Sequence, residues 1–199
     1  MRAGALLLAA GRSSRFEDGH KLLAEHAGEP VVVHAARALA QAGLAPVIVL
    51  GAEADAVREA ITRALPAARA TMVVNERFAE GMGGSIACGM RALAADADAV
   101  LIALGDMPLV GAREVRLVLD AHDAADPRAV TRAVGGGRPG HPTLLGRSWF
   151  DALGRLEGDR GAAAILGNTP FRAVPVEPRT QADVDTREAL AALQRCAHG

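Results

Sequence analysis

Hydrophobic and polar positions alternate in a regular way over the first 125 residues. Short, continuous apolar runs are followed by glycine-rich or polar segments and then by amphipathic stretches. Such runs are typical of buried strands in a parallel sheet, and the amphipathic stretches are typical of covering helices. The pattern predicts four strands, at residues 4–10, 45–51, 70–75 and 99–106. It predicts four helices, at residues 30–43, 55–65, 83–97 and 112–125.

The alternation predicts a three-layer α/β fold with a mostly parallel sheet and right-handed crossovers. Pro30 and Gly43 are in the positions expected at the start and end of the first helix. Asp55 is a candidate N-cap of the second helix. Gly89, inside the third helix, is expected to ease packing.

After residue 125 the pattern changes, which predicts a small β excursion. Two strands, 129–134 and 143–146, flank a Gly/Pro-rich loop at 135–142. The remaining segments are predicted as a helix at about 148–156, a loop at 157–166, a strand at 171–176 and a helix at about 185–196. We expect one domain over residues 1–199, with halves 1–125 and 126–199.

Composition excludes some classes of function. The net charge is −1, from 22 basic and 23 acidic residues, so there is no basic excess for binding nucleic acid or an anionic membrane. The N-terminal apolar run is too short for a membrane span or a signal peptide, so we expect a cytoplasmic protein. Cys88 and Cys196 are far apart and are expected to be buried or incidental thiols.

The segment after the first strand, residues 9–21, is the first candidate site. Small residues there let the backbone approach a ligand, and Arg15 can hold a phosphate with two hydrogen bonds. Lys21 is the only lysine in the chain. Its compact ammonium can follow a moving phosphate, which a rigid guanidinium cannot. The alternative is a solvated basic loop.

Four more residues follow predicted strands or begin helices. Ser85, in the glycine-rich segment 80–90, either binds a ligand at a helix N-terminus or only caps it. Asp106 ends the fourth strand, where a carboxylate can hold Mg²⁺ or serve as a turn residue. His141 is a ligand-binding or a structural histidine. Asp185 is a second metal ligand, the N-cap of the last helix, or both.

Five motifs occur in one order, namely LAAGRSSRF…K, GMGGS, LGDMP, GRPGHP and DVDT. They resemble those of the MobA-like nucleotidyltransferases, and most closely those of the molybdenum cofactor cytidylyltransferases. The resemblance implies a Rossmann-like nucleotidyltransferase fold. It also implies Mg²⁺-dependent transfer of CMP from CTP to the terminal phosphate of molybdopterin, with release of pyrophosphate. Residues 1–125 would bind the nucleotide and 126–199 the acceptor. A molybdenum hydroxylase apoenzyme would be the partner that receives the product.

The resemblance also assigns roles to individual residues. The catalytic group would be Lys21, Arg15 and Asp106. The metal ligands would be Asp106 and Asp185. The acceptor would lie near Arg138 and His141. The nucleotide would be bound by a larger set, Leu8, Ala9, Ala10, Gly11, Ser13, Gly84 and Ser85.

Two departures from the family pattern stand out. The signature loop commonly has Met-Gly after its arginine, whereas this chain has Phe16 followed by Glu17-Asp18-Gly19, which forms a lid or weakens the site. The last motif reads VDTREAL, which keeps Asp185 but lacks the usual proline.

Other functions remain open at this stage. Guanylyltransferase relatives have glycine where this chain has Ala10, which favours CTP over GTP. Sugar-phosphate and methylerythritol-phosphate cytidylyltransferases commonly have proline where this chain has His20. The chain also resembles NAD(P)H-dependent oxidoreductases of the nicotine-blue type, in which hydride transfer would not need Asp106. A non-catalytic carrier of molybdenum cofactor would not need Lys21.

Overall fold

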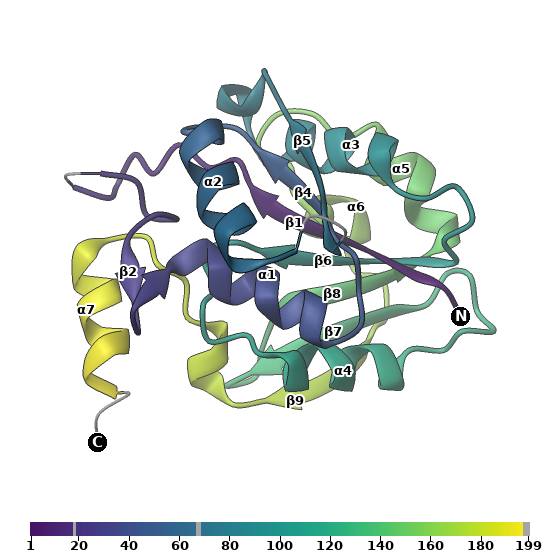
Figure 1. Cartoon of the computed structure of the whole chain (residues 1–199). Coiled ribbons are helices and arrows are strands. Elements are labelled where there is room, and N and C mark those ends of the chain that lie inside the picture. Colours follow the sequence, from purple (N-terminus) through teal and green to yellow (C-terminus); the bar gives the residue numbers. More distant parts are fainter. Residues whose placement is uncertain (18, 67–68, 197–199) are drawn as a thin grey trace.

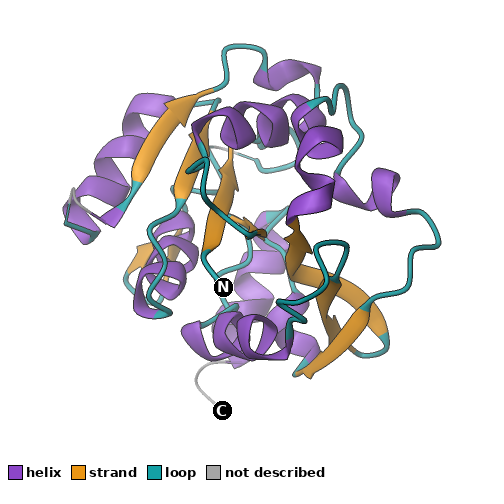
Figure 2. Ribbon diagram, turned by 90° about the vertical axis from the view of Figure 1, so that its right-hand side faces the viewer, coloured by secondary structure: helices purple, strands orange, loops and turns teal. Residues whose placement is uncertain are grey.

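The computed structural model describes residues 1–17, 19–66 and 69–196 of the chain. Its centre is a seven-stranded sheet with the order β5-β4-β1-β6-β8-β7-β9 (Figures 1 and 2). The first four strands along the chain of this sheet are parallel: β1 (Ala3–Ala9), β4 (Val47–Leu50), β5 (Thr71–Val74) and β6 (Ala99–Leu104). The predicted mostly parallel sheet is therefore confirmed.

The rest of the sheet is the predicted β excursion. Strand β8 (Arg138–Gly146) runs antiparallel to both β6 and β7 (Val130–Gly135), and β9 (Arg172–Val176) runs parallel to β7. The predicted loop at 135–142 is wrong, because Gly135 already pairs with Arg138. Gly136 and Gly137, with φ angles of 58° and 77°, form the whole connection. Two residues with positive φ are what a tight hairpin turn requires.

Helices cover both faces of the sheet. One face carries α1 (Val31–Gln41), α2 (Ala54–Ala64) and α4 (Ala112–Ala121). The other carries α3 (Met82–Ala92), α5 (Phe150–Gly154) and α6 (Ala162–Leu166). Side chains of β1 alternate between the two cores: Leu7 and Ala9 face the first, and Leu8 faces the second.

Smaller elements complete the chain. A short hairpin, β2 (Glu25–His26) with β3 (Glu29–Pro30), was not predicted, and it lies beside the C-terminal helix α7 (Arg187–Cys196) in Figure 1. Single 3₁₀ turns are η2 (Phe78–Glu80), η3 (Arg147–Trp149) and η4 (Pro178–Gln181). The loop predicted at 157–166 is wrong at its end, because α6 occupies that part.

Two local predictions fail and one holds. Asp55 is not an N-cap but forms an ion pair with Arg58 inside the first turn of α2. Asp185 does not cap α7, because the hydroxyl of Thr186 accepts the hydrogen bond from the Ala189 N–H. Gly89 does ease packing, because a Cβ there would lie 2.9 Å from Val49 Cγ2.

Two further expectations concern the thiols and membranes. Cys88 is a free, half-buried thiol, and the side chain of Cys196 lies outside the described residues. Over the described part of the chain, no helix has both the length and the apolar character needed to cross a bilayer.

Candidate active site

The segment 9–21, called the signature loop, follows β1 and folds back on itself. Ser13 has a positive φ of 53°, and its carbonyl accepts a hydrogen bond from Phe16 N–H. Its hydroxyl accepts one from the backbone N–H of Lys21, with N and O 3.1 Å apart. The ring Nε2 of His20 donates to Gly11 O over 3.0 Å. The predicted nucleotide contact Ser13 therefore fixes the backbone of Lys21, and His20 is a closing contact that the sequence analysis did not identify.

Phe16 anchors the same loop to the C-terminal part of the chain. Its ring is buried in a cluster that includes Val184 and Leu190, and the guanidinium of Arg187 lies 5.3 Å from the ring centre. Arg187 also donates to the carbonyl oxygen of Glu17. Phe16 is thus part of a small core. The expectation that residues 16–19 form a lid or weaken the site remains a prediction, and Asp18 lies outside the described residues.

Lys21 joins the two predicted metal ligands. Its Nζ lies 2.5 Å from Asp106 Oδ2 and 2.8 Å from Asp185 Oδ1. Arg15 contacts the same cluster from the outside, because its Nη2 lies 2.7 Å from Asp185 Oδ2 and its side chain is 73% exposed. Lys21, in contrast, is only 12% exposed. Burial by itself would lower the pKa of Lys21, but the two carboxylates raise that pKa above its usual value.

A backbone contact explains why residues so distant in sequence meet. The N–H of Val184 donates to the carbonyl oxygen of Asp106, with N and O 2.8 Å apart. This bond holds the segment before α7 against the end of β6. Asp185 follows directly and so lies beside Asp106.

The pair of carboxylates fits a divalent cation. One oxygen of each carboxylate already converges on a single positive charge, the ammonium of Lys21. The remaining oxygen of Asp106, Oδ1, is buried and lacks a hydrogen-bond partner in the described part of the chain. No cluster of three potential metal-ligating side chains occurs among the described residues. Two carboxylates without a third ligand are typical of Mg²⁺ sites in which substrate phosphates complete the coordination.

A cavity of about 160 Å³, the nucleotide-side cavity, opens next to Lys21 and Asp106. Among the predicted nucleotide contacts, Leu8, Ala10, Gly11 and Ser85 line it. The sequence analysis gave no role to the other lining residues, which are Leu22, Phe78, Gly81, Met82 and Leu104. Of these, Gly81 and Met82 belong to the motif GMGGS, and Leu104 belongs to LGDMP. None of the five has a charged or polar side chain, so the place of Gly81, Met82 and Leu104 in these motifs was their signal, whereas Phe78 had none.

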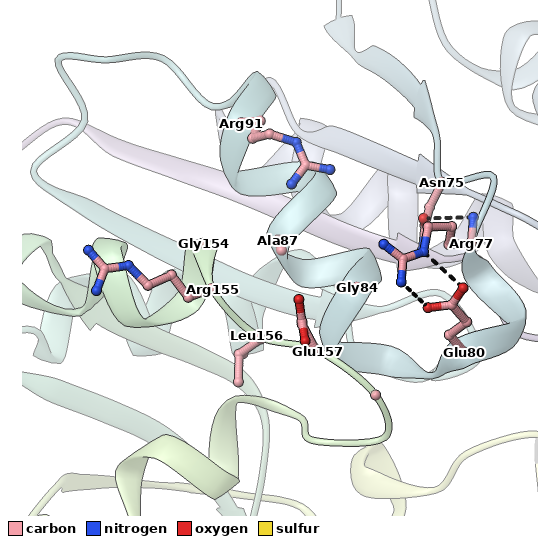
Figure 3. A pocket seen from close by; sticks show the side chains of 11 residues that line it. Asn75, Arg77, Glu80, Gly84, Ala87, Arg91, Gly154, Arg155, Leu156 and Glu157 are labelled. Carbon is pink, nitrogen blue, oxygen red and sulfur yellow. Dashed lines mark hydrogen bonds and ion pairs between the residues drawn. The ribbon is translucent and has the colours of Figure 1, made fainter.

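The predicted contacts Ala9, Ser13 and Gly84 do not line this cavity. Ala9 packs into the core on the opposite face of the sheet, as the alternation along β1 requires. Gly84 lines a different cavity of about 140 Å³, between α3 and the segment after α5 (Figure 3). Asn75 borders that second cavity, and its Nδ2 donates to Ser85 Oγ over 3.0 Å.

A third cavity, of about 570 Å³, is lined by residues of β8 and by the segment before α7, and it is named the acceptor-side cavity after the predicted acceptor residues in its lining. The predicted acceptor residues Arg138 and His141 both line it, and Leu104 borders both this cavity and the nucleotide-side cavity. His141 Nδ1 lies 3.1 Å from Ile102 O, to which it donates. Burial lowers the pKa of His141 below its usual value, which favours the neutral ring. Gln181, which the sequence analysis did not single out, lines the same cavity.

An open α/β sheet with a charged cluster and cavities at the carboxyl ends of its parallel strands is the arrangement of a nucleotide-binding domain. Residues 5–174 match the model of the MobA-like NTP transferase domain, so the chain belongs to that family.

Relatives and solved structures agree with this assignment. The bifunctional protein GlmU of Anaeromyxobacter sp. (strain K) is 32% identical over 194 residues, which are 95% of this chain and 36% of that protein. The chain thus spans about a third of the length of this relative. Rv0371c of Mycobacterium tuberculosis H37Rv is 27% identical with a TM-score of 0.83, and each chain is 98% covered. A second Rv0371c structure, a complex with manganese, is 26% identical with a TM-score of 0.79, over 98% of this chain and 99% of that one. A nucleotidyl transferase from Methanothermobacter, 23% identical, shares the fold with a TM-score of 0.81 over 98% of this chain and 97% of that one.

Proposed function

We propose that the protein is a cytidylyltransferase that transfers CMP from CTP to the terminal phosphate of a molybdopterin-type cofactor and releases pyrophosphate. The observation that carries this proposal is the cluster of Lys21, Asp106 and Asp185 at the nucleotide-side cavity, which Lys21 and Asp106 line. The acceptor-side cavity begins close by, because Leu104 lines both cavities. A cation and two carboxylates at the edge of a cavity suit phosphoryl chemistry. Hydride transfer would leave this cluster without a role.

In the proposed reaction, an oxygen of the acceptor phosphate attacks the α-phosphorus of CTP. The bond from that phosphorus to the bridging oxygen breaks, and pyrophosphate leaves with the electron pair. Catalysis depends on positioning and on neutralising charge. Lys21 exchanges its carboxylate partners for an oxygen of the α-phosphate, where negative charge increases. Arg15, exposed and paired with Asp185, binds the rest of the triphosphate.

Asp106 and Asp185 would hold Mg²⁺, whose positive charge neutralises the triphosphate when it is bound. The manganese complex of Rv0371c supports a divalent cation in a protein of this fold. Residues 126–199 would contribute Arg138 and His141 to the acceptor-binding site, and they would also contribute Asp185 to the metal site. The product would pass to the apoenzyme of a molybdenum hydroxylase in the cytoplasm.

The choice of CTP rests on Ala10. Its side chain is buried at the nucleotide-side cavity, and Gly51 packs against it so closely that a Cβ at Gly51 would lie 2.6 Å from Ala10 O and from Phe78 Cβ. The same added Cβ would lie 2.8 Å from Ala10 Cβ, so Gly51 packs against the methyl group, which occupies space at the cavity that a larger base would need.

Ala10→Gly is expected to shift the preference from CTP toward GTP by about tenfold, which is the usual effect of one methyl group in a binding pocket. The measurement is pyrophosphate release with each nucleotide in the presence of molybdenum cofactor and Mg²⁺. The buried Ala5 of β1 provides the control, because its side chain packs in the core on the opposite face of the sheet from Ala10, so Ala5→Gly removes a methyl group away from the cavity. An unchanged ratio of CTP to GTP turnover in Ala10→Gly would remove the argument for cytidine.

A further inference from the structure

Strand β8 has an irregular segment where it borders the acceptor-side cavity. The register between β7 and β8 shifts between Arg132 and Val134, where three residues of β8 lie opposite the single residue Ala133 of β7, and this interruption of the ladder is called the bulge. The paired residues on β8 are Pro139 and Thr143, so the segment 140–142 is outside the regular ladder with β7. A bulge leaves backbone groups unpaired and turns a side chain in a new direction.

The side chain of Gln181 makes the hydrogen bonds to the backbone of His141 that β7 does not make. Oε1 of Gln181 accepts a hydrogen bond from His141 N–H over 3.0 Å, and its Nε2 donates to His141 O over 2.8 Å. The amide thus makes with one residue the two bonds that an opposing residue makes in an antiparallel sheet. Thr143 Oγ1 donates to Gly140 O, so the bulged segment is held on both sides of His141.

Two glycines admit the amide. A Cβ at Gly140 would lie 1.9 Å from Gln181 Oε1, and a Cβ at Gly135 would lie 2.7 Å from Gln181 Cγ. The glycine before His141 therefore has a specific partner, and side chains at these two positions would displace Gln181.

His141 is fixed at three points by these contacts. Its backbone N–H and C=O are bound to Gln181, and its ring Nδ1 donates to Ile102 O. Its other ring nitrogen, Nε2, makes no hydrogen bond to any of the described residues. It is also absent from the set of fully buried polar atoms that lack a partner. In this tautomer Nε2 is an acceptor of hydrogen bonds.

We propose that Gln181 is a positioning residue, which holds His141 in the bulge so that its Nε2 accepts a hydrogen bond from the acceptor molecule. This inference rests on the proposed function, because it takes the cavity around His141 as the acceptor site. It adds one requirement to that function: the molecule that receives CMP must have an N–H or O–H group that donates a hydrogen bond to His141 Nε2.

Three variants test this inference. Gln181→Leu removes both hydrogen bonds. Gln181→Glu keeps the acceptor for His141 N–H but places a carboxylate against His141 O. Gly140→Ala leaves Gln181 intact and displaces its amide. Gln41→Glu makes the same change of charge as Gln181→Glu at the exposed end of α1 and is the matched control.

We expect kcat/KM for molybdenum cofactor to fall about tenfold to a hundredfold in all three variants, as misplacement of a binding group by about 1 Å does. The calorimetric Kd for CTP should stay unchanged. In ¹⁵N spectra of the imidazole rings, the wild type should show His141 with the proton on Nδ1, and Gln181→Leu should show a mixture of tautomers. Gln41→Glu should match the wild type in every measurement.

A purely structural role would lower the melting temperature and leave the tautomer and the KM for the acceptor unchanged, and that result would overturn the proposal. The spectra need no substrate. If the wild type transfers no CMP, the proposed function fails, whereas the tautomer of His141 still decides whether Gln181 positions the ring. An unchanged tautomer in Gln181→Leu would refute the positioning role in either case.

Discussion

Lys21→Met is expected to reduce nucleotidyl transfer by about a thousandfold, the upper range for loss of one preorganised group that stabilises transition-state charge. Methionine has a similar length but no charge, so negative charge on the α-phosphate would go uncompensated. The variant also leaves Asp106 and Asp185 together without the cation that now bridges them. We therefore expect a lower melting temperature without metal, and partial recovery with Mg²⁺. The measurements are pyrophosphate release and thermal unfolding with and without Mg²⁺.

Lys21→Arg separates charge from mobility. The guanidinium keeps the positive charge but is planar and rigid, so it cannot follow the phosphate as an ammonium does. We expect turnover well below that of the wild type. Wild-type turnover by Lys21→Arg would show that only charge matters at this position, and the argument from mobility would then fail.

Asp106→Asn is expected to reduce transfer by about a hundredfold to a thousandfold, comparable to the loss of a key electrostatic group. The amide has the same shape, but it cannot offer the metal the charged oxygen that Asp106 Oδ1 provides. Stabilisation of the protein by CTP with Mg²⁺ should be lost as well. Calorimetry with CTP, with and without Mg²⁺, measures this directly.

The matched control is Asp120→Asn, which removes an exposed carboxylate from α4. It should leave both transfer and metal-dependent binding unchanged. If Asp106→Asn instead retained transfer and metal-dependent binding of CTP, Asp106 would be a turn residue, and the proposed metal site would be wrong.

The alternation of strands and helices could be predicted because buried strands and amphipathic helices have distinct periods. The same periodicity also predicts that the side chain of Ala9 points away from those of Leu8 and Ala10, because neighbouring residues of a strand face opposite cores. The pair Gly136-Gly137 between two strands was likewise a signal of a tight hairpin.

The contacts within the site could not be predicted in the same way. Lys21, Asp106 and Asp185 were each identified from motifs, but their joint ion pairs depend on the bond between Val184 and Asp106, which is a tertiary contact. Gln181 lies in a polar segment, where a glutamine carries no pattern. Its role follows only from the bulge in β8 and from the space that Gly140 leaves.

The central claim, that a nucleoside triphosphate binds with a divalent cation at Lys21, Asp106 and Asp185, is tested most directly by thermal unfolding. The panel consists of CTP, GTP, ATP and NADPH, each with and without Mg²⁺. A ligand at a hundred times its Kd stabilises a protein by about 2.7 kcal/mol, which such a measurement detects. We predict stabilisation by CTP that requires Mg²⁺. Stabilisation by NADPH alone, independent of metal and without any effect of CTP, would contradict the account.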